Sequence, residues 1–242
     1  MSREFMRRRM LAGAGACLLL APVVSAEREE KAGSKAGEEK EVGAVEDLMR
    51  EHGVLRRALL VYIETVPRIR QGAADIDAGA LTRVARLFRS FGEDYHEKKL
   101  EEAHIFPVVK KTATPAAGYV DVLIAQHQRG REVTDYVMAV TRSGKIGTGV
   151  AEPLAKALST FVLMYQNHTA REDTIVFPAW KTALSQHQIE EWGDKFEDIE
   201  KQQFGTDGYE EAFKEIAAVE QRLGFADLAQ FTPPPPPAVA RS

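Results

Sequence analysis

The sequence has almost no cysteine: Cys17 is the single one among 242 residues. It lies in an N-terminal segment that we expect to be removed, so the mature chain would have none. Disulfide bonds, zinc–thiolate sites and thiol catalysis are therefore excluded for the mature chain. The remaining composition, 28% charged and 44% hydrophobic, is that of an ordinary globular protein with one core.

An excess of positive charge is also missing. The formal net charge is -4 and the sequence pI is about 5.9. Beyond the N-terminus no basic stripe runs along the sequence. Nucleic acid is therefore not an expected partner.

A long apolar run is the third absence. The stretch Met10–Val24 is rich in Gly and Ala and shorter than the ~20 residues of a membrane span. It follows Arg7–Arg9 and ends in "VSA", which predicts a secretory signal over residues 1–26. The arginine run resembles a twin-arginine signal, a route for folded proteins. We therefore expect an exported, periplasmic bacterial protein with no membrane segment in its mature form.

Two further segments have too few large apolar residues to build a core. Residues 27–43 are charged and contain Gly, which predicts a linker. Residues 232–242 hold a run of prolines, which predicts a disordered tail.

Between these segments the apolar residues recur every three or four positions, and no strand pattern appears. Helices are predicted at about 43–66, 77–111, 118–142 and 151–183, separated by breaks such as "TATPAAG" and "SGKIGTG". Short connections predict an all-α, antiparallel four-helix bundle over residues 44–183. Ser185 and Gln188 form a capping-box pattern for the first of two more helices in 184–231, which we expect to pack on the bundle.

Four of the six histidines fall one on each long helix, and the helices group into two halves with the same order of residues. Each half has a histidine on its first helix, then a histidine, a glutamate and a Phe-Pro pair on its second. The residues are His52, His96, Glu101 and Phe106-Pro107 in the first half, and His127, His168, Glu172 and Phe177-Pro178 in the second. A repeat of this kind is more specific than any one motif within it.

This pattern points to a metal site. Buried imidazoles and carboxylates are costly unless they are paired or bound to metal. A Glu four residues after a His points into the same volume, so two facing half-sites would offer four imidazoles and two carboxylates to two metals. Nitrogen and oxygen ligands without thiolate suit iron, with manganese and zinc possible. We expect Phe106 and Phe177 to shield the site, and Glu102 and Asp173 to support the ligands or lie on the surface.

With these residues in place, the chain resembles the hemerythrin-like, or HHE cation-binding, family. The family motif is a His on one helix, then His-x-x-x-Glu and Phe-Pro on the next, given twice. The resemblance covers about residues 45–183 closely and extends to about 232. Segments such as "EDLMREHGVLRR", "AQHQRGREVTDY" and "HTAREDTIVFP" are similar to the exported bacterial branch.

The resemblance implies a four-helix bundle with two iron ions, bridged by oxo, hydroxo or carboxylate groups. Carried over by position, the implied metal ligands are His52, His96, Glu101, His127, His168 and Glu172.

One stretch departs from the family motif. His96 lies five residues before Glu101, and the family pattern would place a His at Glu97. A π-bulge would bring His96 and Glu101 onto one face. A regular helix would instead align Glu97, Glu101 and His104. We favour the bulge because it restores a symmetric ligand set, with His104 then lying behind the ligands.

The leading functional hypothesis is a di-iron protein that binds O2 or NO for carriage, sensing or scavenging. The alternative is a di-iron redox enzyme that turns over peroxide or NO with an unknown redox partner, or a protein that repairs iron centres. Repair relatives generally carry an added N-terminal cysteine-containing domain, which this sequence lacks. A third reading is a plain helical bundle with a docking tail, for which the six ligand positions would have to be coincidental.

Overall fold

The computed structural model describes residues 42–72 and 76–237. The predicted signal segment, nearly all of the linker and the end of the proline tail lie outside this part of the chain. Residues 42–72 and 76–237 contain helices and no strand, so the all-α prediction is confirmed.

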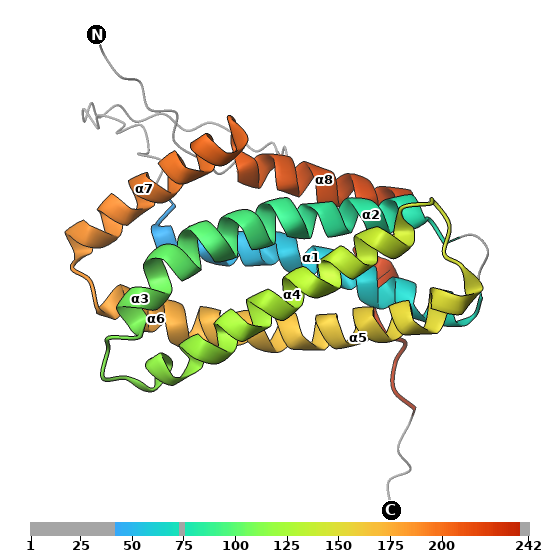
Figure 1. The fold of residues 1–242 in the computed structure, drawn as a ribbon, viewed down its shortest axis with the longest axis horizontal. Coiled ribbons are helices and arrows are strands. Elements are labelled where there is room, and N and C mark those ends of the chain that lie inside the picture. Colours follow the sequence, from blue (N-terminus) through green and yellow to red (C-terminus); the bar gives the residue numbers. More distant parts are fainter. Residues whose placement is uncertain (1–41, 73–75, 238–242) are drawn as a thin grey trace, which may run out of the picture. The chain divides into compact units, whose positions relative to one another are not determined.

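Four long helical rods make up the bundle (Figure 1). The first is α1 (Ala44–Arg70). The second runs without a break through α2 (Ala78–Leu87), the π-helix η1 (Phe88–Ile105) and α3 (Phe106–Val109). The third is the short 3₁₀ turn η2 (Pro115–Tyr119) followed by α4 (Val120–Thr141). The fourth joins α5 (Thr148–Arg171), the π turn η3 (Glu172–Val176) and α6 (Phe177–Thr182).

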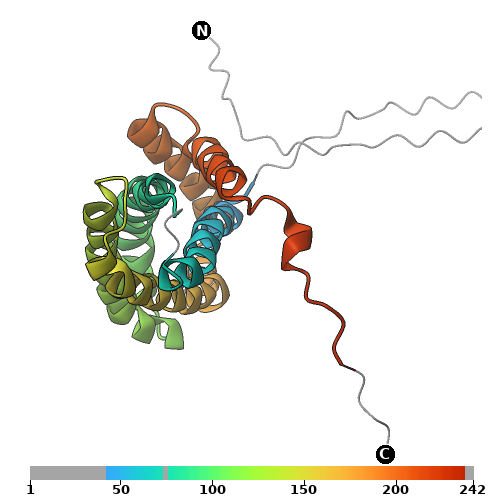
Figure 2. The same cartoon turned by 90° about the vertical axis from the view of Figure 1, so that its right-hand side faces the viewer.

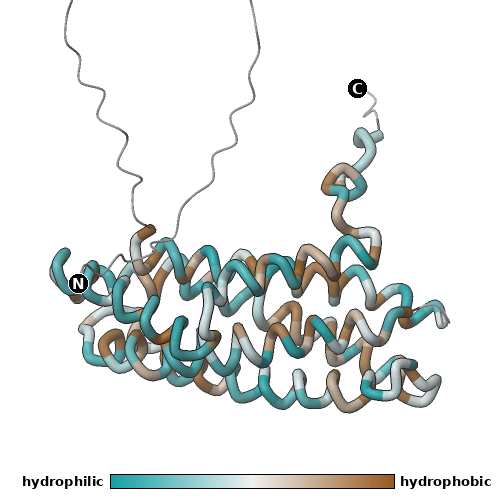
Figure 3. Tube along the Cα trace, turned by 90° about the horizontal axis from the view of Figure 1, so that it is seen from above, coloured by the Kyte–Doolittle hydropathy of each residue, from teal (hydrophilic) through white to brown (hydrophobic). Residues whose placement is uncertain are grey.

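The rods pack as a closed bundle. α1 lies against α5, α5 against α4, α4 against α2 and η1, and η1 against α1. Hydrophobic and hydrophilic residues alternate along the helices (Figure 3), as expected where one stripe of each helix faces a core. The predicted four-helix bundle is therefore confirmed.

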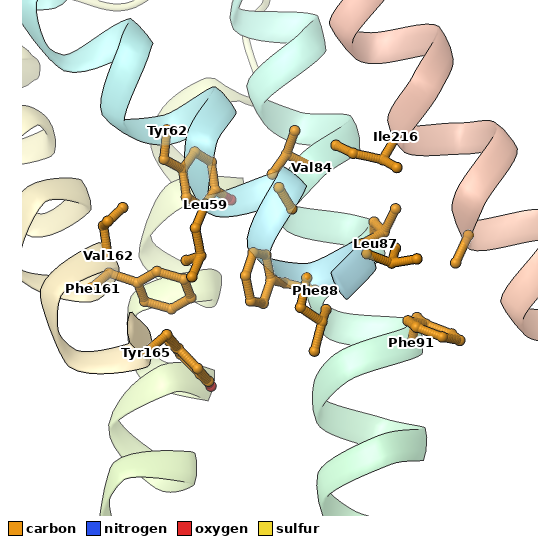
Figure 4. Close-up of a cluster of buried hydrophobic side chains, with 14 of the residues drawn as sticks. Leu59, Tyr62, Val84, Leu87, Phe88, Phe91, Phe161, Val162, Tyr165 and Ile216 are labelled. Atoms are coloured by element: carbon orange, nitrogen blue, oxygen red, sulfur yellow. The ribbon is translucent and has the colours of Figure 1, made fainter. Parts of the chain in front are cut away.

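Aromatic side chains fill the middle of the bundle (Figure 4). Phe88, Phe161 and Tyr165 are almost fully buried, and the Phe88 and Phe161 rings meet edge to face with centroids 5.0 Å apart. Burying each such side chain contributes about 1.5–3 kcal/mol. Tyr165 also contacts His168, with ring centroids 5.4 Å apart, so the aromatic core continues directly into the histidines.

Two more helices, α7 (Gln186–Phe204) and α8 (Gly208–Leu223), lie outside the ring of four (Figure 2). Ser185 and Gln188 form the expected capping box of α7. α8 packs on α1 and α2 through buried Ile216 and Val219, and Arg57 of α1 pairs with Glu220.

A 3₁₀ turn, η4 (Leu228–Phe231), follows α8. Within the part of the chain that the structure describes, no helix has the length and apolar character of a membrane span.

Candidate metal centre

The second rod is widened where it carries His96 and Glu101. Residues Phe88–Ile105 are π-helical, and the N–H of Phe106 donates to the carbonyl of Glu101, five residues back. This wider turn places His96 Nε2 3.3 Å from Glu101 Oε1. The expected π-bulge is confirmed, and it occupies most of the rod rather than a single turn.

The second half has a π turn that the sequence did not predict. It covers Glu172–Val176, where the N–H of Phe177 donates to the carbonyl of Glu172. His168 and Glu172 lie on the same face without its help, because they are four residues apart. Both π segments end directly before a Phe-Pro pair, whose proline has no N–H to donate.

The four histidines meet as two pairs. His52 Nε2 lies 2.9 Å from His96 Nε2, and His127 Nε2 lies 3.0 Å from His168 Nε2. Because one nitrogen of each imidazole turns toward its pair mate, each pair presents two nitrogens to one small volume.

The two carboxylates join these pairs. Glu101 places Oε1 3.3 Å from His96 Nε2 and Oε2 3.3 Å from His127 Nε2. Glu172 places Oε2 3.5 Å from His52 Nε2 and Oε1 2.9 Å from His168 Nε2. Each carboxylate thus offers one oxygen to each histidine pair, which is the arrangement that bridging two cations requires.

A second set of side chains holds the outer nitrogen, Nδ1, of every imidazole; we call it the partner ring. The pairs are His52 with Asp173 (2.7 Å), His96 with Glu51 (2.5 Å), His127 with Glu102 (2.9 Å) and His168 with Gln126 (2.9 Å). Each partner comes from the neighbouring rod, so the ring runs once around the bundle. An imidazole that donates from Nδ1 keeps the lone pair of Nε2 free for a metal.

Only half of the partner ring was expected from the sequence. Glu102 and Asp173 were expected to support the site or lie at the surface, and they support it. Glu51 and Gln126 were missed. Their signal was present, since each directly precedes the first histidine of its half. Which imidazole each would reach depends on the packing of the rods.

Aromatic rings close the site, as expected. Phe177 stacks on His52 with centroids 5.4 Å apart, and Phe106 stacks on His127 with centroids 5.5 Å apart. Each Phe-Pro pair thus shields the first histidine of the opposite half. Both phenylalanines are buried and exclude water from the imidazoles.

The donor set fits a cation. The side chains of His52, His96, Glu101, His127, His168 and Glu172 are only 0–3% exposed. All four carboxylate oxygens of Glu101 and Glu172 are buried without a hydrogen-bond partner. Burying such oxygens without a donor or a cation is costly, so the arrangement is explained by bound metal.

The pKa values of the two acids move in opposite directions. Burial opposes ionisation at both, but the charge on His96 and His127 outweighs burial at Glu101 and holds the pKa of that carboxyl well below its usual range. At Glu172, burial and the Glu101 carboxylate together hold the pKa well above it. The imidazoles therefore supply enough positive charge for one acid, and a cation would let both ionise.

The regular-helix alternative for the first half is wrong, because the rod is π-helical there. His104 is not brought to the cluster: it lies against Trp192 of α7, with ring centroids 4.8 Å apart. Glu97 borders the cluster beside His127 and Glu102. It accepts a hydrogen bond from the Tyr165 hydroxyl at 2.6 Å and lies 3.3 Å from Arg131.

The bundle and its His/Glu clusters define a metal-binding helical protein. The family described as hemerythrin HHE cation binding domain matches residues 43–180, so the chain belongs to the hemerythrin family. Membership implies binding of metal ions, typically iron, and the family binds small ligands such as O2.

Similar proteins occur in mycobacteria. Proteins from Mycobacterium tuberculosis (strain ATCC 25618 / H37Rv) and Mycobacterium bovis, both described as uncharacterized, are 42% identical to this chain over 193 residues. These matches cover 79% of this chain and 74% of each relative. No solved structure matches.

Proposed function

We propose that the chain is a non-haem di-iron protein that binds a small diatomic ligand, O2 or NO, for carriage, sensing or scavenging. The observation that carries this proposal is the pair of carboxylates, each of which reaches both histidine pairs.

The chain would hold one iron at the His52/His96 pair and the other at the His127/His168 pair. Glu101 and Glu172 would each give one oxygen to one iron and the other oxygen to the second iron. Four protein donors for each iron would leave coordination positions open for an added ligand. When bound, a ferrous pair supplies these open positions together with electrons for a diatomic ligand.

The surroundings favour a binding protein. The imidazoles are fixed by the partner ring, so they do not need to reorganise when a ligand arrives. Phe106, Phe177 and the aromatic core keep the volume dry. A site this enclosed suits a ligand of two atoms better than a larger substrate.

The test is the optical spectrum of anaerobically purified, iron-loaded, reduced protein before and after admitting O2 or NO. New bands that disappear when the gas is removed would support a carrier or sensor. Rapid, irreversible oxidation of the iron would favour the redox enzyme, and turnover of peroxide or NO would then be measured. A spectrum without iron-dependent bands would contradict the di-iron assignment.

We also propose that the mature protein is exported to the periplasm. The support is the basic, apolar and small-residue order of residues 1–26. Cell fractionation with N-terminal sequencing tests this: the mature chain should start near Glu27 in the periplasmic fraction. A full-length chain in the cytoplasm would contradict the proposal.

A further inference from the structure

The partner ring has one member that differs in charge. Three imidazoles donate from Nδ1 to a carboxylate: Asp173, Glu51 or Glu102. His168 alone among the four donates to an amide oxygen, that of Gln126. Gln126 occupies the place in the second half that Glu51 occupies in the first, because both directly precede the first histidine of their half.

This difference in charge makes one histidine pair a weaker electron donor than the other. A hydrogen bond to a carboxylate is roughly twice as strong as one to a neutral acceptor, and it makes the imidazole a better electron donor. The His52/His96 pair has two carboxylate partners. The His127/His168 pair has one carboxylate and one amide.

Glu102, the one carboxylate partner of the second pair, is also a weaker hydrogen-bond acceptor than its counterparts in the first pair. Glu102 Oε1, which accepts from His127, lies 2.7 Å from Arg131 Nη2 and is shared with that cation. In the first pair, Arg56 binds Oδ2 of Asp173 and leaves Oδ1 to His52. A shared oxygen donates less charge to its imidazole than an unshared one.

Glu97 adds negative charge to the second pair, but at the other histidine. It lies beside His127, accepts a hydrogen bond from the Tyr165 hydroxyl and is 3.3 Å from Arg131. The partner of His168 Nδ1 is still the neutral Gln126, so the difference between Gln126 and Glu51 acts at His168.

We propose that the two metal positions differ in affinity, and that Gln126 makes the His127/His168 position the one that releases its metal first. The inference rests on the proposed di-iron function. It describes a centre with one firmly held metal and one exchangeable metal. Gln126 is a positioning residue, since it acts through His168.

The experiment follows release of iron from anaerobic, ferrous-loaded protein into an excess of a chromogenic ferrous chelator. The natural chain should release its iron in two phases of equal amplitude. His168→Ala should remove the fast phase and His52→Ala the slow phase, which assigns each phase to a pair.

Near-isosteric variants then test Gln126. Gln126→Glu should slow the fast phase about 10–100-fold, and Asp173→Asn should accelerate the slow phase by a similar factor. Gln128→Glu adds the same charge at an exposed position of α4 and should change neither phase. Circular dichroism should show that all three variants fold.

The outcomes separate the two proposals. Uptake of two ferrous ions followed by single-phase release, or a fast phase that Gln126→Glu does not slow, would overturn the inference and leave the di-iron function standing. An equal slowing by Gln128→Glu would also overturn it, because the effect would then be a general one of charge. Failure to take up two ferrous ions would overturn both.

Discussion

The two halves of the bundle reach the same donor set by different backbone routes. In the second half, His168 and Glu172 are four residues apart and share a face of an ordinary helix. In the first half, His96 and Glu101 are five apart, and the rod widens into a π-helix to bring them together. An extra residue therefore changes the helix and leaves the chemistry of the site in place.

The halves differ again outside the donor set, where Glu51 in one corresponds to Gln126 in the other. Both side chains accept a hydrogen bond from an imidazole Nδ1, but one acceptor is a carboxylate and the other is a neutral amide. We infer that the positions of the donor atoms and their strength as metal ligands are set by separate residues.

The largest effect is expected from the carboxylates that join the halves. Glu101→Ala or Glu172→Ala should lower the content of both metals, because each carboxylate places one oxygen beside each histidine pair. Metal content per folded chain, measured by elemental analysis, checks this. Loss of only one metal would show that the carboxylates do not bridge.

Removing one histidine should lower metal binding in only one of the two histidine pairs. His96→Ala should lose about one metal per chain, because its Nε2 belongs to a single pair. Glu97→Ala and His104→Ala serve as comparisons and should retain both metals. If His96→Ala kept both metals while Glu97→Ala lost one, the role assigned to the π-helix would be contradicted.

A smaller effect concerns Glu93, which is buried in η1 and accepts a hydrogen bond from Thr134. Burial raises its pKa from 4.5 to about 7. The folded chain therefore holds a proton that the unfolded chain releases, and stability should fall as pH rises from 4.5 through about 7.

Glu93→Gln should remove this part of the pH dependence, on the order of 3 kcal/mol for a shift of this size. Urea unfolding of both proteins at about pH 4 and about pH 8, on either side of the two pKa values, measures it. Parallel pH dependence in the two proteins would show that Glu93 ionises normally.

The smallest expected effect is on stability, when a glycine in each half is replaced by alanine. A Cβ at Gly130 would lie 2.1 Å from the Tyr165 hydroxyl, whereas a Cβ at Gly53 would meet nothing within 4 Å. Gly130→Ala should cost about 1–3 kcal/mol through displacement of Tyr165. Gly53→Ala should stabilise its helix by up to about 1 kcal/mol. Thermal unfolding distinguishes them, and equal midpoints would mean that Tyr165 moves aside freely.

Much of this molecule could be predicted from the sequence. Apolar spacing predicted the four rods, and the repeated order of His, Glu and Phe-Pro predicted which side chains meet. The extent of the π-helix could not be predicted, because it depends on how a whole rod accommodates one residue.

The partner ring and His104 show a second limit. Gln126 reaches His168 on another rod, so its role follows from which rods are neighbours. His104 lies on a helix with the site residues, yet it packs on Trp192 because α7 covers that face. Such contacts are tertiary, and spacing along one helix does not contain them.

In the proposed centre, each of the two like halves of the bundle would hold one iron. The most direct measurement is the iron content of the anaerobically reconstituted, desalted protein, determined together with protein concentration by amino-acid analysis. We expect about two irons per chain in the natural protein and about one in each of His96→Ala and His168→Ala. One iron or none in the natural chain, or no loss in these variants, would contradict it.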